Sequence, residues 1–199
     1  MQQGLQVNYQ AQHGILNTVQ KFLERLGYIV RPGENAAWFR YDKHLRPFDI
    51  VAKADPTQKW IGIDIGLADP TRTGMLQSGE HYFKSGKAAD RLCTKKHDWM
   101  RNAKRMHGGL KEPVDHKPVI FETTGSWGKS ASDFLKPLIK ECKELQMKLP
   151  SGKWTWAAQT YPAYLTQQIS FHVSKFSAMA VLEGSRAILK ARAARCSHL

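Results

Sequence analysis

The sequence predicts an α/β protein in which short apolar strands alternate with amphipathic helices. Three observations support this: two apolar segments around a polar turn in residues 46–69, helical spacing of apolar residues on both sides of them, and a long periodic segment at the C-terminus. With 199 residues, 42% of them hydrophobic, the chain can bury a core. We expect the core in residues 1–150, with residues 151–199 forming an aromatic linker and a long, basic-ended helix packed on it.

Two predicted strands form the centre of the protein, and each carries one aspartate among apolar residues. Asp49 precedes Ile-Val-Ala, and Asp64 has an isoleucine on each side. The polar segment 54–59 predicts a hairpin that places both carboxylates side by side. A carboxylate among branched apolar side chains is costly unless it is paired or binds a metal, so the pair suits Mg²⁺ or Mn²⁺. Aspartates at exposed strand ends are the alternative interpretation.

The remaining elements follow from periodicity and turn residues. We expect helices at residues 13–27, 87–106, 130–145 and from 162 onwards, strands at 28–30, 36–41 and 118–125, a loop at 70–85 and an aromatic linker at 153–156. The helix at 87–106 has an apolar face that includes Trp99. Lys96 lies on the same face, where a lysine is unusual because that face should meet the sheet.

The charge of the chain predicts an anionic partner. Lysine and arginine number 30 against 17 acidic residues, a net charge of +13, which is typical of nucleic-acid binding. A ribosomal protein or a membrane-surface binder would also fit. The candidate nucleic-acid-binding residues lie on the expected helix 87–106: Lys87, Arg91, Lys95, Arg101, Lys104 and Arg105. For each single residue, a solvated helix face is the simpler interpretation.

Several classes of protein do not fit the sequence. No apolar run is long enough for a membrane span, and the first thirty residues lack the pattern of a secretory signal. Three cysteines at wide spacing, without Cys-x-x-Cys, argue against a disulfide framework and a zinc module. We therefore expect an intracellular protein of the nucleus or an organelle. The oligomeric state is not predicted.

The order of elements, with two aspartates in a hairpin and an inward lysine on the next helix, resembles the PD-(D/E)XK nuclease fold. In detail the chain resembles the restriction-like endonuclease domain of site-specific non-LTR retrotransposons and related reverse-transcriptase elements. The resemblance covers about residues 12–190 and rests on these segments: Gln12-His13-Gly14, Pro47-Phe-Asp49, the 14 residues 50–63 that separate Asp49 from Asp64, Asp64 to Pro70, Ala88-Ala89 with Lys95, Lys96 and Trp99, and Glu122-Thr-Thr-Gly125.

The chain departs from the family pattern at three points. Phe48 is inserted between the usual adjacent Pro and Asp. Gly66 occupies the position, two residues after the second acid, where a lysine is common. In this family the following helix supplies that lysine, which makes Lys96, or Lys95, the candidate. Residues 1–199 include neither a reverse transcriptase nor a zinc knuckle.

The resemblance implies a small mixed sheet flanked by helices and a metal-dependent endonuclease that hydrolyses DNA phosphodiester bonds. Asp49, Asp64 and the backbone carbonyl of Ile65 would hold Mg²⁺ or Mn²⁺, and Lys96 would orient water and stabilise developing charge. Glu122 is a candidate for a further ligand or for a structural cap. His13 is a candidate for a packing residue or a phosphate contact.

A retroelement-derived protein that has lost catalysis is the alternative function. Such a protein would bind RNA or protein as a structural component of a ribosome, a mitochondrial ribosome included, or of another ribonucleoprotein. In that case an internal partner such as Lys96 would neutralise Asp49 or Asp64, and added metal would have no effect.

Overall fold

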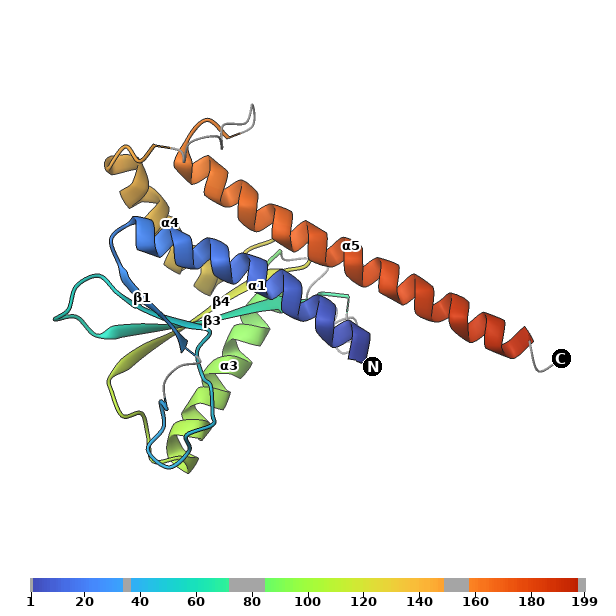
Figure 1. The fold of residues 1–199 in the computed structure, drawn as a ribbon, viewed down its shortest axis with the longest axis horizontal. Coiled ribbons are helices and arrows are strands. Elements are labelled where there is room, and N and C mark those ends of the chain that lie inside the picture. The colour runs from blue at the N-terminus through green and yellow to red at the C-terminus, as the bar shows by residue number, and fades with distance from the viewer. Residues whose placement is uncertain (1, 34–36, 72–84, 149–157, 197–199) are drawn as a thin grey trace.

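The computed structural model describes residues 2–33, 37–71, 85–148 and 158–196, and it has the predicted α/β architecture with a small mixed sheet flanked by helices (Figure 1). The loop expected at 70–85 and the linker at 153–156 lie largely or wholly outside these residues. In chain order the elements are α1 (Gln2–Arg25), β1 (Ile29–Pro32), β2 (Ile50–Lys53), β3 (Trp60–Ala68), α3 (Lys87–Met106), β4 (Val114–Glu122), α4 (Lys129–Glu144) and α5 (Tyr161–Cys196).

The sheet has the strand order β1-β2-β3-β4, with antiparallel pairing up to β3 and parallel pairing of β3 with β4. The turn between β2 and β3 is fixed by Asp55, whose Oδ1 accepts a hydrogen bond from Thr57 N at 2.8 Å. A parallel pair needs a long crossover, and here α3 lies in the connection between β3 and β4. The predicted hairpin is therefore present as β2 and β3, and β3 lies inside the sheet between β2 and β4.

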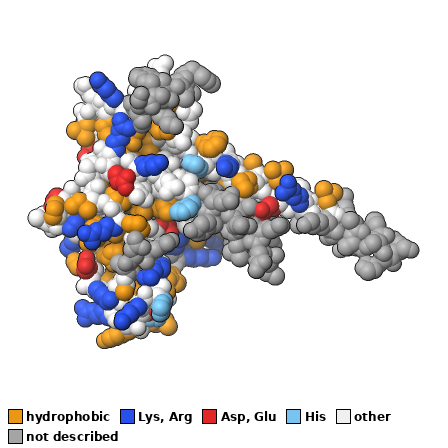
Figure 2. Space-filling view, viewed as in Figure 1, with side chains coloured by type: hydrophobic (Ala, Val, Ile, Leu, Met, Phe, Trp, Pro, Cys, Tyr) orange, Lys and Arg blue, Asp and Glu red, His pale blue; other side chains and the backbone are white. Residues whose placement is uncertain are grey.

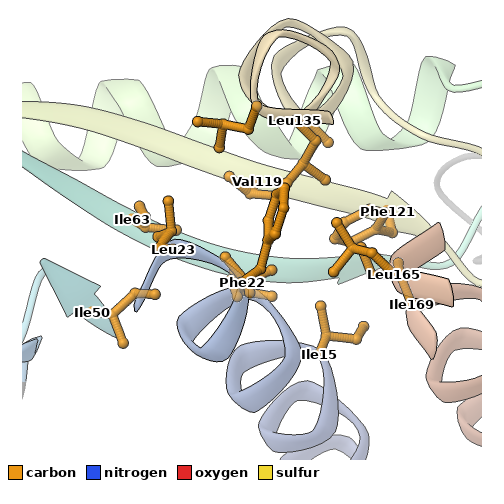
Figure 3. Close-up of a cluster of buried hydrophobic side chains, with 14 of the residues drawn as sticks. Ile15, Phe22, Leu23, Ile50, Ile63, Val119, Phe121, Leu135, Leu165 and Ile169 are labelled. Atoms are coloured by element: carbon orange, nitrogen blue, oxygen red, sulfur yellow. The ribbon is translucent and has the colours of Figure 1, made fainter. Parts of the chain in front are cut away.

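The two faces of the sheet carry different helices. On one face α1, α4 and α5 bury a large apolar cluster with Ile63 and Ile65 of β3 (Figure 3). On the other face α3 packs against smaller clusters, one of them around Phe48 and Met100. Side chains alternate along a strand, so Asp64, between Ile63 and Ile65, projects towards α3.

Three predicted boundaries differ from the structure. The first helix begins at Gln2 rather than at residue 13, and it ends at Arg25, before Gly27, whose φ is +87°. No strand occurs in residues 37–41. Phe39 in this segment makes only an isolated bridge to Leu110 and is fully buried. The apolar residues that suggested a strand are therefore there for core packing. The last strand begins at Val114 instead of residue 118.

The long C-terminal helix α5 runs beside α1 over its first half and extends past the rest of the molecule (Figure 1). Leu165 and Ile169 are buried against α1. Leu189, which the predicted apolar stripe includes, is 63% exposed, so the buried stripe ends earlier than its periodicity indicates. No helix among the described residues combines the length and apolarity of a membrane span.

We expect Gly62→Ala to destabilise the fold. A Cβ at Gly62 would lie 2.4 Å from Cδ1 of Phe48 and 2.8 Å from Cγ1 of Val114. Phe48 is only 2% exposed and cannot swing into solvent, so the overpacking should lower the free energy of unfolding by about 1–3 kcal/mol. Urea unfolding measures the change. Gly184→Ala in α5 is the control, because a Cβ there meets no atom within 4 Å. Equal stability of both variants would contradict the prediction.

Candidate functional site

The register of the β2–β3 hairpin brings Asp49 and Asp64 together. Ile50 pairs with Ile63 at the end of the β2–β3 ladder, and Asp49 directly precedes Ile50. Asp49 lies close enough to Asp64 for the charge of that carboxylate to raise the pKa of Asp49. Asp49 N donates to Ile63 O at 2.9 Å, and Asp49 Oδ2 accepts from Ile65 N at 2.7 Å. The Asp49 carboxylate is therefore fixed by the backbone of the strand that carries Asp64.

Helix α3 places Lys96 against this pair. Lys96 Nζ forms an ion pair with Asp64 Oδ1, and the two side chains are 24% and 14% exposed. Lys95 is exposed, so Lys96 is the lysine that reaches the carboxylates. A Cβ at Gly66 would lie 3.2 Å from Lys96 Cε and 2.8 Å from Ile120 Cδ1. Gly66 thus leaves the space that the Lys96 side chain occupies, and this residue type at position 66 fits a lysine supplied from α3.

The third proposed metal ligand, the carbonyl of Ile65, already has a protein partner. Gln12 Nε2 in α1 donates to Ile65 O at 2.8 Å. A carbonyl oxygen has two lone pairs, so this bond orients the oxygen without excluding a second contact. Gln12 was expected only as part of a segment that carries the family resemblance, with no role at the site, since a hydrogen bond across 53 residues leaves no local pattern.

The Asp49 carboxyl is in an environment that disfavours its charge. Burial raises its pKa above the ordinary value for aspartate. The hydrogen bond from Ile65 N opposes this effect, the negative charge of Asp64 adds to it, and the charge of Lys96 again lowers the pKa. A cation between the two carboxylates would relieve both the burial cost and the mutual repulsion.

The pair offers the oxygen donors that a hard divalent cation prefers. Asp64 Oδ2 takes no part in the hydrogen bonds described above, and the Asp49 carboxylate also accepts a hydrogen bond from the Gln12 side chain, which lowers the pKa of Asp49. Among the described residues, no three His, Cys, Asp or Glu side chains converge to hold a metal ion, so a cation would depend on these carboxylates, the Ile65 carbonyl and water. Such a set with several waters suits Mg²⁺ or Mn²⁺, and the residues fit the group that the sequence predicted.

His116 in β4 is a neighbour of the site that sequence reasoning missed. Its Nε2 lies 3.8 Å from Asp64 Oδ2, and the residue is 8% exposed. The segment 114–117 mixes polar and apolar residues, so the strand was expected to begin after it. The correct strand boundary would have placed His116 beside β3.

Glu122 and His13 lie apart from the carboxylate pair. Glu122 is opposite Ala68, whereas Asp64 is opposite Pro118. Glu122 is buried, and its Oε1 accepts from Ala88 N at 2.8 Å and from Ala89 N at 3.4 Å at the start of α3. Of the two roles considered for Glu122, the geometry is that of a helix cap. His13 is exposed on α1.

The basic residues of α3 present a positive surface, and Lys and Arg side chains gather around its C-terminal end (Figure 2). The candidates Arg91, Lys95, Arg101 and Arg105 are exposed, and Lys87 and Lys104 are half-buried. Arg101 forms a weak surface pair with Asp98 at 3.3 Å. Trp99 was expected to face the sheet but is 43% exposed, because Met100 fills that space and is 3% exposed.

A groove of about 580 Å³ opens beside Lys96, between β3, α3 and α5. Its walls include Gln12 from α1, Lys96 from α3 and Ser177 from α5. The groove reaches Lys96, and its lining includes neither Asp49 nor Asp64.

The sequence matches no model of a known protein family and no curated protein. The relation to retroelement endonucleases therefore rests on the motifs and enters only as a proposal.

We expect Asp49→Asn to stabilise the protein in chelating buffer at neutral pH. The raised pKa means that the folded state binds the Asp49 proton more tightly than the unfolded chain does. Stability from this group is therefore complete below the ordinary aspartate pKa of about 3.9 and is lost as the pH rises through the folded pKa. Asparagine carries no charge and its oxygen can still accept from Ile65 N. The melting temperature should rise by about 2–4 °C at pH 7, the shift given by ~1 kcal/mol in a chain of this size.

Melting curves from pH 3 to pH 8 measure this effect. The advantage of the variant should shrink towards pH 3, where both side chains are neutral. A constant difference at every pH would show that the charge of Asp49 is not its cause.

Proposed function

We propose that the protein is a metal-dependent endonuclease that hydrolyses DNA phosphodiester bonds, of the restriction-like kind that its motifs resemble. The observation that carries the proposal is the proximity of Asp49, Asp64 and Lys96: Asp49 accepts a hydrogen bond from the amide next to Asp64, and Lys96 pairs with Asp64. A half-buried carboxylate destabilises a strand face unless it is paired or binds a cation. Lys96 pairs with Asp64 alone, so a cation would offset the remaining cost at Asp49. Gly66, which leaves room for Lys96, adds independent support.

The residues divide the chemistry between them. Asp49, Asp64 and the Ile65 carbonyl would hold the cation, and Gln12 keeps that carbonyl in place. When bound, the divalent cation supplies Lewis-acid polarisation of the phosphate and lowers the pKa of its water. Lys96 would orient the attacking water and stabilise the charge that develops on the phosphate. Because Lys96 contacts Asp64 directly, cation binding and charge stabilisation would take place in the same site.

Helix α3 connects this site to the nucleic acid. Its exposed basic residues would contact phosphates without reading bases, so affinity should fall steeply with salt. Each phosphate contact on duplex DNA adds about 0.9 to the log–log slope. Trp99 lies one turn after Lys96 and offers an exposed ring on which an unpaired base could stack.

A specific observation favours a second function, that of a catalytically silent nucleic-acid-binding protein. Lys96 pairs with Asp64 and Gln12 occupies one lone pair of the Ile65 carbonyl, so protein atoms already satisfy part of the site. A retroelement-derived component of a ribosome or another ribonucleoprotein would need nothing more from these residues. We favour the enzyme because the Asp49 carboxylate, with its raised pKa, has no cationic side chain paired with it among the described residues.

Two measurements on the full chain test the proposal. A nuclease should nick supercoiled plasmid in Mg²⁺ or Mn²⁺, and its melting temperature should rise with Mn²⁺ concentration. Binding to the folded state alone adds about 2.7 kcal/mol at 100 times the dissociation constant. A flat melting temperature together with an intact plasmid would reject the enzyme and leave the binding protein.

A further inference from the structure

His116 is a buried imidazole that lacks hydrogen bonds. The residue is 8% exposed, and neither ring nitrogen has a hydrogen-bond partner among the described residues. Buried polar atoms are nearly always paired, and each exception calls for an explanation. An imidazole used only for packing would be replaced at no loss by an apolar side chain, so its nitrogens point to a contact made in another state of the protein.

The surroundings of His116 identify one polar group in position to make that contact. His97 meets the imidazole edge-on with ring centroids 5.2 Å apart, and the ring of Phe48 is tilted at 5.9 Å. The carboxylate of Asp64 is the nearest acid, with Oδ2 3.8 Å from Nε2, just beyond hydrogen-bond distance. The other oxygen, Oδ1, pairs with Lys96.

The strand register holds His116 beside Asp64. His116 pairs with Gly62 across the parallel β3–β4 ladder, and Asp64 is the next β3 residue on the same face. Gly62 places no side chain between them. Both residues lie in paired strands, so the backbone keeps them next to each other. A small movement of the Asp64 carboxylate would bring Oδ2 from 3.8 Å to hydrogen-bond distance of Nε2.

We propose that His116 is a positioning residue for Asp64, donating its Nε2–H to Asp64 Oδ2 in the cation-bound protein. The inference rests on the proposed function, because it assigns the bond to the metal-loaded site. Carboxylates that ligate metals are usually held by such outer hydrogen bonds, and loss of one typically weakens metal binding 10- to 100-fold. The two nitrogens of His116 without hydrogen-bond partners are then accounted for by this donor role.

The test uses two replacements of similar length and flexibility. His116→Gln keeps an N–H donor near the position of Nε2, and His116→Met removes it. Melting temperature is measured for each full-length variant in EDTA and across a Mn²⁺ titration, with His97→Phe as the control for the neighbouring ring. A donor role predicts that His116→Met needs about 10-fold or more Mn²⁺ for half of the shift. His116→Gln and His97→Phe should stay within about threefold of the parent.

A second readout separates positioning from packing. In EDTA, His116→Met should melt at or above the parent temperature, because an apolar group replaces unsatisfied polar atoms. Higher stability without metal together with weaker metal binding is a combination that packing alone does not give. Equal Mn²⁺ midpoints for the Met and Gln variants would overturn the role of His116 while leaving the nuclease proposal intact. A parent protein that shows no Mn²⁺ response would overturn both.

Discussion

Asp64→Asn is expected to abolish Mg²⁺-dependent cleavage while nucleic-acid affinity stays within a few fold of the parent. The substitution removes one of two carboxylates that lie close together at the hairpin, and with it part of the charge that would hold the cation. Cleavage should fall at least about 100-fold, within the range for loss of an essential catalytic group. The basic surface of α3, which would supply the affinity, is unchanged. Plasmid nicking and filter binding on the same preparation separate the two effects.

Asp55→Asn is the matched control for this substitution. Asp55 lies in the turn of the same hairpin, is half-buried and binds Thr57 rather than the site. The control should cleave at the parental rate. Undiminished cleavage by Asp64→Asn would remove the catalytic assignment of the hairpin. The effect of Asp64→Asn on stability should be small, because loss of repulsion with Asp49 is offset by loss of the ion pair with Lys96.

The elements that sequence patterns predicted well are those whose burial is decided locally. The hairpin has alternating apolar residues on both sides of a polar turn, and α3 has an apolar stripe at helical spacing, so both were expected at nearly their observed positions. Lys96 could be singled out because it interrupts that stripe. Its contact with Asp64 then follows from the packing of α3 on the sheet.

The parts that the sequence did not predict depend on tertiary contacts. Phe39 looks like a strand residue but is buried by a long-range bridge to Leu110. The link from Gln12 to Ile65 joins α1 to β3, and no local pattern encodes it. Trp99 was assigned to the inner face because it lies at helical spacing from the apolar residues of α3. In the structure Met100, one residue further along the helix, points to the sheet and is buried, and Trp99 is left 43% exposed.

The sequence also placed Glu122 among acids that could bind a metal, and only the register resolves its role. Its carboxylate accepts hydrogen bonds from the first amides of α3. In β4, Glu122 lies four residues after Pro118, the residue that pairs with Asp64. The cap fixes the start of α3, and α3 carries Lys96 to the site. Glu122 therefore contributes to the geometry of the site through the helix rather than as a ligand.

Lys96→Met should reduce turnover about 100- to 1,000-fold while changing affinity for nucleic acid only slightly. Methionine keeps an unbranched side chain over Gly66 but removes the charge next to Asp64. A positive group that stabilises charge mainly in the transition state affects the rate of the chemical step, and loss of one such donor costs a factor of that size. Single-turnover cleavage at saturating protein measures the chemical step, and salt-dependent binding measures affinity.

Two neighbouring lysines serve as controls for this substitution. Lys95→Met removes an exposed charge one residue away, and Lys104→Met removes a charge two turns further along α3. Both should weaken binding and lower its salt slope by up to about 0.9, the value for one phosphate contact, with turnover at saturation unchanged. If Lys95→Met alone slows the chemical step, the working lysine is Lys95 and the ion pair with Asp64 is structural. If all three variants lose only affinity, Lys96 belongs to the binding surface, and the silent binding protein becomes the better description of this chain.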